Sequence, residues 1–498
     1  MSQKIYSLYK PFRNRLVNDY NLIDGLYVIW AFSRNNLFNY SFPPDIELPN
    51  NFDPNGDFYK RYKGGIPEFQ LEFLMKQILI NCPDFSTKKS FLKSAELAKV
   101  VNYLRKELYE KIEEEVMISE DDVFIEFNRK AHTQFKEQVS YSPATILRYY
   151  KIYSDKTLNS LIESKLQLTV HELFIIGFIF FDSTAKFFRN QLPIPHKIPK
   201  ISDENINTFI SNFSISIEAA KEELKRYQQV NENLFYTFNP LLAKPIIVYK
   251  NSYLCPIPLM VYYLITEGIY YNIVDNKGVF SEAYGNSFQN YIGEVLYKIC
   301  SEKLSIFPEE KYYSPEEKRT TDWILEDENS IMFIECKTLR LTLISKTNMD
   351  MNTPKGLNED LVEMAKQITK IYVTYLDYVD NKYPQIKYKQ NKIFFPSIVI
   401  LEEWYLFANP MLDMKLKELI IIEMAKKSVD ISLLEKYPYV MFSSKNFETD
   451  IQLINLLGIS TYFEKFFKVE LNEIRDNTKF NHVFENEFIE TFLNPLRQ

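Results

Sequence analysis

The chain has 498 residues, of which 46% are hydrophobic and only 11 are glycine, with 39 phenylalanines and 35 tyrosines. This composition is typical of packed globular domains and excludes long low-complexity or disordered stretches. The formal net charge of −7 at pH 7 excludes non-specific coating of nucleic acid or anionic membranes, so that any nucleic-acid site must be a local patch.

Cysteine spacing and the lack of long apolar segments indicate the cellular compartment of the protein. Cys82, Cys255, Cys300 and Cys336 are scattered without a C-x-x-C pair, which argues against a zinc site and for reduced thiols. The N-terminus has no apolar segment of signal-peptide length, and the longest apolar run, residues 173–181, is far shorter than the ~20 residues of a membrane-crossing helix. We therefore expect a cytoplasmic protein without membrane contacts, with residues 173–181 in a buried helix.

Residues 1–275 are expected to form a mostly helical recognition or regulatory region, because segments such as 216–227 consist largely of strong helix formers. Proline and asparagine clusters near 42–56 and prolines near 192–199 interrupt the helical pattern. They either separate two helical subdomains or are excursions of one. Two short apolar runs within residues 245–256 predict a β-hairpin.

Residues 276–450 follow a turn and alternate between helices and strands, and residues 451–498 are expected to be a helical extension. The expected order is a helix, three strands, a helix and a strand, with a further helix and strand appended. The expected ranges are 282–300, 304–307, the two halves of a hairpin at 320–338, 358–378, 396–401, 412–427 and 439–442. Asn358 is expected to cap its helix. The fold class is therefore α+β, with a mostly helical N-terminal half and a C-terminal α/β domain.

The hairpin carries the most informative charged residues of the chain. Alternation along its second strand places Glu335 and Lys337 on one face together with Ile331 and Phe333. If the two strands pair, Asp322 on the first strand approaches Glu335, and two carboxylates then lie beside an ammonium group. Because carboxylates repel one another, a hard cation is the expected third component.

The Glu-x-Lys string alone is weak evidence, because it also begins at Glu163, Glu223, Glu309 and Glu316. The first two of these lie in helical patterns, and the other two lie in a polar loop beside prolines. Only Glu335 follows an apolar strand that is preceded by a strand bearing an aspartate. The alternative is a solvated hairpin tip in which the glutamate and the lysine simply pair. The strand is apolar on both faces, however, which predicts burial and hence a need for partners or metal.

These residues and this order of elements resemble the PD-(D/E)xK nuclease superfamily over about residues 280–445. The resemblance implies a restriction-endonuclease-like core, a mixed sheet flanked by helices, that hydrolyses phosphodiester bonds with Mg²⁺, for which Mn²⁺ is an expected substitute. It further implies that Asp322, Glu335 and the carbonyl of Cys336 bind the metal and that Lys337 positions or activates the attacking water.

The flanking helices supply further candidates. Glu294, in the helix before the hairpin, is a candidate metal ligand, with Glu282 as a competitor and an ordinary solvated glutamate as the alternative. In the helix after the hairpin, the resemblance makes Gln367 a candidate catalytic residue, because several family members use a glutamine there. Lys366 and Lys370 share its polar face and are candidates to reach a phosphate or the active site.

Two stretches are candidates for a local basic patch. Arg340 and Lys346 lie in an acid-free run directly after the proposed catalytic strand. Lys387 and Lys389 are interleaved with tyrosines, a mixture suited to phosphates and stacked bases. The alternative for both stretches is a solvated loop.

The expected function is that of a Mg²⁺-dependent nuclease acting on DNA, in restriction or antiviral (anti-phage) defence. A catalytically silent binding module on the same fold and a nuclease acting on RNA are the alternatives. A homodimer or higher oligomer is expected because double-strand cutting usually needs two sites, and separate defence-system proteins are left open as partners.

Overall fold

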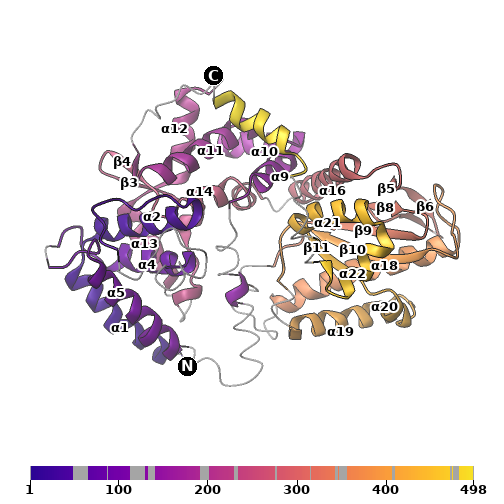
Figure 1. Ribbon diagram of the computed structural model, residues 1–498, viewed down its shortest axis with the longest axis horizontal. Coiled ribbons are helices and arrows are strands. Elements are labelled where there is room, and N and C mark those ends of the chain that lie inside the picture. Colours follow the sequence, from indigo (N-terminus) through magenta and orange to yellow (C-terminus); the bar gives the residue numbers. More distant parts are fainter. Residues whose placement is uncertain are drawn as a thin grey trace. The chain divides into compact units, whose positions relative to one another are not determined.

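The computed structural model divides into two compact units, each described here by itself (Figure 1). The first unit comprises Met1–Tyr150, Asn159–Val274 and Ile489–Gln498, and the second comprises Lys151–Leu158 and Asp275–Phe488. The structure describes residues 2–48, 66–86, 88–112, 129–132, 141–190, 201–228, 234–274, 278–314, 316–341, 346, 356–405, 410–471, 474 and 482–496.

The first unit is mainly helical, as its sequence predicts. Its main helices are α1 (Ser2–Asp19), α2 (Leu22–Phe38), α4 (Glu68–Asn81), α5 (Ser94–Asn102), α9 (Pro143–Tyr153), α10 (Lys156–Leu166), α11 (Val170–Lys186), α12 (Asp203–Phe213), α13 (Ile217–Gln228), α14 (Leu259–Leu264) and α15 (Ile269–Ile273). Helix α11 contains the long apolar run and is buried along it, and its start is fixed by a capping box between Thr169 and Glu172. Among the described residues no single helix is long and apolar enough to cross a membrane, and only α10 and α11 together, bent by 65°, meet the criteria of length and composition.

A small sheet completes the first unit, with strand order β1-β4-β3-β2. Its strands are β1 (Arg189–Asn190), β2 (Ser214–Ser216), β3 (Ile246–Tyr249) and β4 (Ser252–Leu254). Strands β3 and β4 pair antiparallel, which confirms the predicted hairpin, and Lys250 in its turn has a φ of 53°. Helix α13 begins at Ile217, because Ser216 still belongs to strand β2.

The second unit is built on a mixed sheet with strand order β11-β10-β9-β8-β5. Its strands are β5 (Ser305–Pro308), β8 (Trp323–Glu326), β9 (Ser330–Lys337), β10 (Ile393–Ile400) and β11 (Val440–Ser443). Strands β5, β8 and β9 are antiparallel neighbours, whereas β9, β10 and β11 run parallel. The helices are α16 (Val279–Ile299), α18 (Leu357–Val379), α19 (Pro410–Lys426), α20 (Ser432–Lys436), α21 (Ser444–Leu457), α22 (Ile459–Phe467) and α24 (Glu485–Phe488).

Alternating residues of the central strands face different helices. Phe333 packs its ring against Tyr375 and Tyr378 of α18, with centroids 6.3 and 5.7 Å away. Trp323 lies on the opposite face, against α16, where a Cβ added at Gly293 would lie only 2.2 Å from its ring. The glycine thus allows helix α16 to approach strand β8 closely. Figure 1 shows α16 and α18 on different sides of the sheet.

Three sequence predictions about this unit need correction. Helix α18 begins at Leu357 with Gly356 as its N-cap, so Asn358 lies in the first turn and does not cap it. The polar stretch before β8 is not a plain loop but contains a two-stranded sheet of β6 (Lys311–Tyr313) and β7 (Glu317–Arg319).

The expected domain boundary at residue 450 falls inside α21. This helix belongs to the second unit, because Phe447 and Ile451 are fully buried and Tyr291 of α16 donates a hydrogen bond of 2.6 Å to Glu448. The unit continues to Phe488, and only the last ten residues return to the first unit. The boundary expected at residue 275 does agree with the division into units.

Candidate active site

Strand register brings Asp322 and Glu335 together. Strand β8 pairs with β9 so that Trp323 lies opposite Ile334, and one more step along this register sets Asp322 opposite Glu335. Side chains opposite one another on antiparallel strands have Cβ atoms about 5 Å apart. Asp322 is 6% exposed and Glu335 is 0% exposed. Two carboxylates are therefore buried side by side at one end of the hairpin, on the face that α18 covers.

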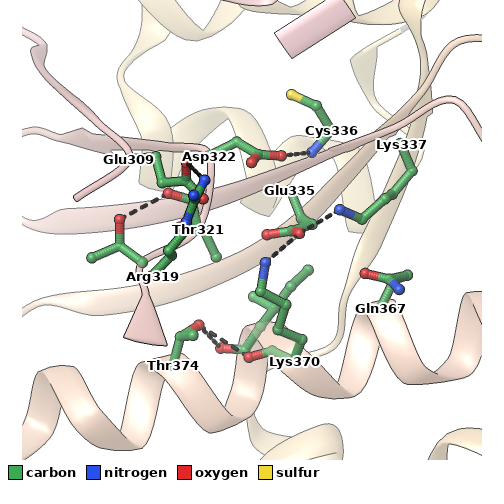
Figure 2. Close-up of polar contacts among 12 residues, drawn as sticks. Glu309, Arg319, Thr321, Asp322, Glu335, Cys336, Lys337, Gln367, Lys370 and Thr374 are labelled. Atoms are coloured by element: carbon green, nitrogen blue, oxygen red, sulfur yellow. Dashed lines mark hydrogen bonds and ion pairs between the residues drawn. The ribbon is translucent and has the colours of Figure 1, made fainter. Parts of the chain in front are cut away.

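Few hydrogen-bond donors serve this carboxylate pair. The backbone N–H of Cys336 donates to Asp322 Oδ2 at 2.6 Å. Lys337 Nζ lies 2.7 Å from Glu335 Oε1, and Lys370 Nζ of α18 lies 2.7 Å from the same oxygen (Figure 2). The second oxygen of this carboxylate, Oε2, is buried and has no hydrogen-bond partner among the residues that the structure describes. One oxygen of Glu335 is thus doubly paired while the other is left unsatisfied.

The pKa values of Asp322 and Lys337 are shifted by their surroundings. Burial, and next the charge of Glu335, raise the pKa of Asp322 to about 7, against the opposing effects of Lys337 and the Cys336 N–H. Burial disfavours the charged form of Lys337, but the charges of Glu335 and Asp322 outweigh it and raise the pKa of Lys337 to about 12. Lys337 is therefore an ammonium group at neutral pH.

The carboxylate pair fits a hard divalent cation. Mg²⁺ prefers oxygen ligands and is often held by one or two carboxylates together with water and substrate phosphates. The unsatisfied Oε2 of Glu335 is an oxygen available for this purpose. Within the described ranges no group of three or more His, Cys, Asp or Glu side chains is arranged to hold a metal. Water, the substrate and the backbone carbonyl of Cys336 are candidates for further ligands, and Figure 2 shows the Cys336 thiol turned away from the carboxylates.

The structure does not bring Glu294 to the carboxylate pair. Its side chain is 52% exposed and forms an ion pair of 2.8 Å with Lys151, which also pairs with Glu487 at 2.7 Å. The helical register explains this, because Gly293 and its buried neighbours occupy the face of α16 that meets the sheet. Glu282, the competing candidate, is also exposed. The expected role of Glu294 as a metal ligand is therefore wrong for this structure.

Polar residues of α18 make two kinds of contact, either with a glutamate of the same helix or with the carboxylate pair. Gln367 donates to Glu363 Oε1 at 2.8 Å, and Figure 2 shows it on the side of α18 that faces Lys337. Lys366 is exposed and pairs with Glu363 at 3.3 Å. Lys370, predicted to reach a phosphate or the active site, bonds Glu335 directly. Of these residues, only Lys370 contacts the carboxylate pair.

The basic residues that follow strand β9 pair with an acid from a distant part of the chain. Arg340 is 7% exposed at its side chain and pairs with Glu402 at 2.9 Å, while it donates to Tyr284 Oη at 2.8 Å. Lys346 lies 3.4 Å from the same carboxylate. Arg340 is thus a buried structural residue, contrary to its expected role in nucleic-acid binding.

The second basic stretch lies at the other end of the sheet. Strand register sets Ile393 opposite Ser330 and Ile400 opposite Lys337, so the loop that precedes β10 is at the end of β9 remote from Glu335. Seven residues of strand correspond to about 23 Å. Lys389 in this loop pairs with Glu326 at 3.1 Å, and Lys387 is exposed. These lysines are therefore not next to the carboxylate pair.

Sequence reasoning did not identify Glu402 and Tyr284 as partners of Arg340, because they lie 62 and 56 positions away in the chain and no local pattern links them. It did place Lys370 on the correct face of α18, but without its partner. Comparison with known proteins gives no further candidate, because no family model, no curated protein and no solved structure matches this chain.

Proposed function

We propose that the second unit is a Mg²⁺-dependent nuclease that hydrolyses the phosphodiester bonds of DNA. One observation carries this proposal: Asp322 and Glu335 are buried opposite one another with an unsatisfied carboxylate oxygen and with two ammonium groups beside them. Burying two facing carboxylates is unfavourable for folding, and a hard cation would offset that cost. Such an arrangement is typical of sites that bind a cation and an anionic substrate together.

The residues would divide the chemistry as follows. A bound Mg²⁺ would supply charge stabilisation for the phosphate oxygens and lower the pKa of a bound water. Asp322 and Glu335 would hold it, and the Cys336 N–H fixes the orientation of the Asp322 carboxylate. With a pKa of about 12 in the metal-free protein, Lys337 is an ammonium group, and as such it would orient the attacking water or a phosphate oxygen.

The order of elements supports the same proposal. The resemblance to the PD-(D/E)xK superfamily implies a helix, antiparallel strands, a second helix and a parallel strand in that order. The chain has α16, then the antiparallel strands β5, β8 and β9, then α18, and then the parallel strand β10. The restriction-endonuclease-like core is therefore part of the proposal, as are DNA as substrate, a role in restriction or anti-phage defence, and a homodimeric or higher assembly.

A cleavage assay tests the proposal. The full chain is incubated with supercoiled plasmid, linear duplex DNA and single-stranded RNA, with Mg²⁺, with Mn²⁺ or with EDTA. We expect cleavage of DNA with either metal, none with EDTA, and a loss of at least about 10³-fold in Asp322→Asn, since transition-state charge stabilisation is typically worth this much. Cleavage by the variant at the wild-type rate would contradict the site assignment, and cleavage of RNA alone would replace the substrate.

One observation favours a second candidate, a catalytically silent binding module on the same fold. Glu335 Oε1 already bonds two ammonium groups without any metal. For such a module we expect binding of a labelled DNA duplex that is unaffected by Mg²⁺ and by Asp322→Asn, with no cleavage under any condition. Metal-dependent cutting by the wild-type chain would exclude it.

A further inference from the structure

Lys370 and Lys337 hold Glu335 in different ways. Both ammonium groups lie 2.7 Å from Glu335 Oε1. Lys337 belongs to the same strand as the glutamate and is 24% exposed, whereas Lys370 reaches in from α18 and is 38% exposed. Within the described residues, Lys370 forms its ion pair with Glu335. Lys370 is therefore the ammonium group that can leave the carboxylate for solvent with the least rearrangement.

When both acids are ionised, the site is balanced in charge without a metal. Asp322 and Glu335 then carry two negative charges, and Lys337 and Lys370 carry two positive charges. A divalent cation added to this cluster would bring two positive charges that nothing in the cluster compensates, and unit charges a few Å apart interact strongly away from bulk water. A phosphate anion arriving at the same place would restore the balance. Binding of the cation and of a phosphate group should therefore favour one another.

We propose that Lys370 exchanges partners, bonding Glu335 in the metal-free protein and a phosphate of the nucleic acid when a divalent cation is bound, so that cation and nucleic acid bind cooperatively. This inference rests on the proposed function, because it requires a cation at Asp322 and Glu335. Lys370 is a positioning residue in this scheme. In the metal-free state it competes with the cation for Glu335, and in the loaded state it attracts the substrate.

The test measures binding and not turnover, with the full chain and with Ca²⁺ as the probe cation. Calorimetry gives the affinity for Ca²⁺ alone, and the anisotropy of a fluorescein-labelled DNA duplex gives its affinity with and without Ca²⁺, with a gel to verify that the duplex stays intact. For wild type we expect Ca²⁺ to tighten DNA binding about tenfold, within the usual range of coupling between two ligands. By reciprocity DNA must tighten Ca²⁺ binding by the same factor.

Lys370→Met should raise the affinity for Ca²⁺ alone and weaken the coupling between Ca²⁺ and DNA binding. We expect Ca²⁺ alone to bind several-fold more tightly, because one competing ammonium group is gone, while its tightening of DNA binding falls to about twofold or less. Lys370→Arg should retain the wild-type coupling. Lys417→Met is the matched control, since Lys417 is also a helical lysine with one ion pair, 2.8 Å from Asp413, and should leave both affinities unchanged. Thermal unfolding of each variant verifies its fold.

The outcomes separate this inference from the proposed function. If wild type cuts DNA with Mg²⁺ and Lys370→Met shows unchanged coupling, or binds Ca²⁺ no more tightly than wild type, the exchange of partners is wrong and the nuclease assignment stands. If wild type neither cuts DNA nor binds Ca²⁺, both are wrong. If wild type does not cut but shows the expected coupling and its loss in Lys370→Met, the exchange stands and the nuclease assignment fails.

Discussion

The two ends of the β8–β9 hairpin hold the same motif in different surroundings. Each end has a glutamate that is at most 8% exposed and whose Oε1 bonds two lysine ammonium groups. The lysines are Lys337 and Lys370 for Glu335, and Lys389 and Lys392 for Glu326. A buried glutamate with two lysines is therefore not by itself evidence of a catalytic site.

The neighbouring aspartates differ. Beside Glu326, the carboxylate of Asp327 accepts backbone N–H groups at both oxygens, from Asn329 and Ser330 at Oδ1 and from Ile459 at Oδ2. Asp327 thus has a structural role in closing the turn. At the other end, Asp322 faces Glu335, its pKa is raised to about 7, and an oxygen of the pair is left without a donor. The difference shows that facing acids with too few donors, and not the Glu–Lys pair, distinguish the candidate site.

The strongest test of this comparison removes the charge of each glutamate in turn. Glu335→Gln should lower the rate of Mg²⁺-dependent plasmid cleavage by about 10³-fold or more, because a cation ligand is lost. Glu326→Gln should leave the rate within about threefold of wild type. Initial rates from agarose gels measure both. Similar losses in the two variants would remove the distinction between the ends of the hairpin.

Substitution of a lysine at each end of the hairpin should affect a different property, the cleavage rate for Lys337 and the stability for Lys392. Lys337→Met should lower the cleavage rate by about 10²-fold, as expected for a group that stabilises charge in the transition state. Lys392, 6% exposed at its side chain, pairs with Glu326 at 2.8 Å, so Lys392→Met should lower the free energy of unfolding by about 3 kcal/mol and spare the rate per folded molecule. Urea unfolding and initial rates give the two values. A rate loss for Lys392→Met that exceeds its loss of folded protein would contradict this assignment.

Metal binding should stabilise only a protein with an intact carboxylate pair. Mg²⁺ at about a hundred times its dissociation constant should stabilise the wild-type unit by about 2.7 kcal/mol. Glu326→Gln should show the same gain, whereas Asp322→Asn should show none. Thermal melting across a series of Mg²⁺ concentrations measures the shift in Tm. An equal shift for Asp322→Asn would mean that the cation binds elsewhere.

The raised pKa of Asp322 predicts a dependence of stability on pH in the absence of metal. The folded protein keeps the proton of Asp322 up to about pH 7, whereas an unfolded aspartate loses it near pH 4. Folding therefore takes up a proton between these values, and stability falls as pH rises through this window and then levels off. Between pH 5.5 and 7.0 we expect a fall of about 2 kcal/mol from this group.

Urea unfolding in EDTA at the two pH values measures that fall, and Asp322→Asn provides the control. The variant has no carboxyl at this position, so its stability should lack this component of the pH dependence. The same slope in wild type and variant would show that other groups cause it.

Local pattern accounts for what the sequence predicted correctly. Alternation along residues 320–338 predicted the hairpin and the common face of Glu335 and Phe333, and helical periodicity and turn residues predicted the order of elements around it. A prediction that depended on a single residue was wrong: the N-cap of α18 is Gly356 and not Asn358. The expected boundary at residue 450 failed because α21 buries its apolar face on α16, which a pattern within α21 does not reveal.

For the candidate site, strand periodicity and a short turn are local properties, and they were enough to predict that Asp322, Glu335 and Lys337 share one hairpin. The bond from Lys370 to Glu335, the pairing of Glu402 with Arg340 and the outward orientation of Glu294 became visible only in the folded chain. Those contacts join residues 35 to 143 positions apart. The pairing of β9 with β10 and the packing of helices on the sheet set them, and no spacing along the chain encodes either.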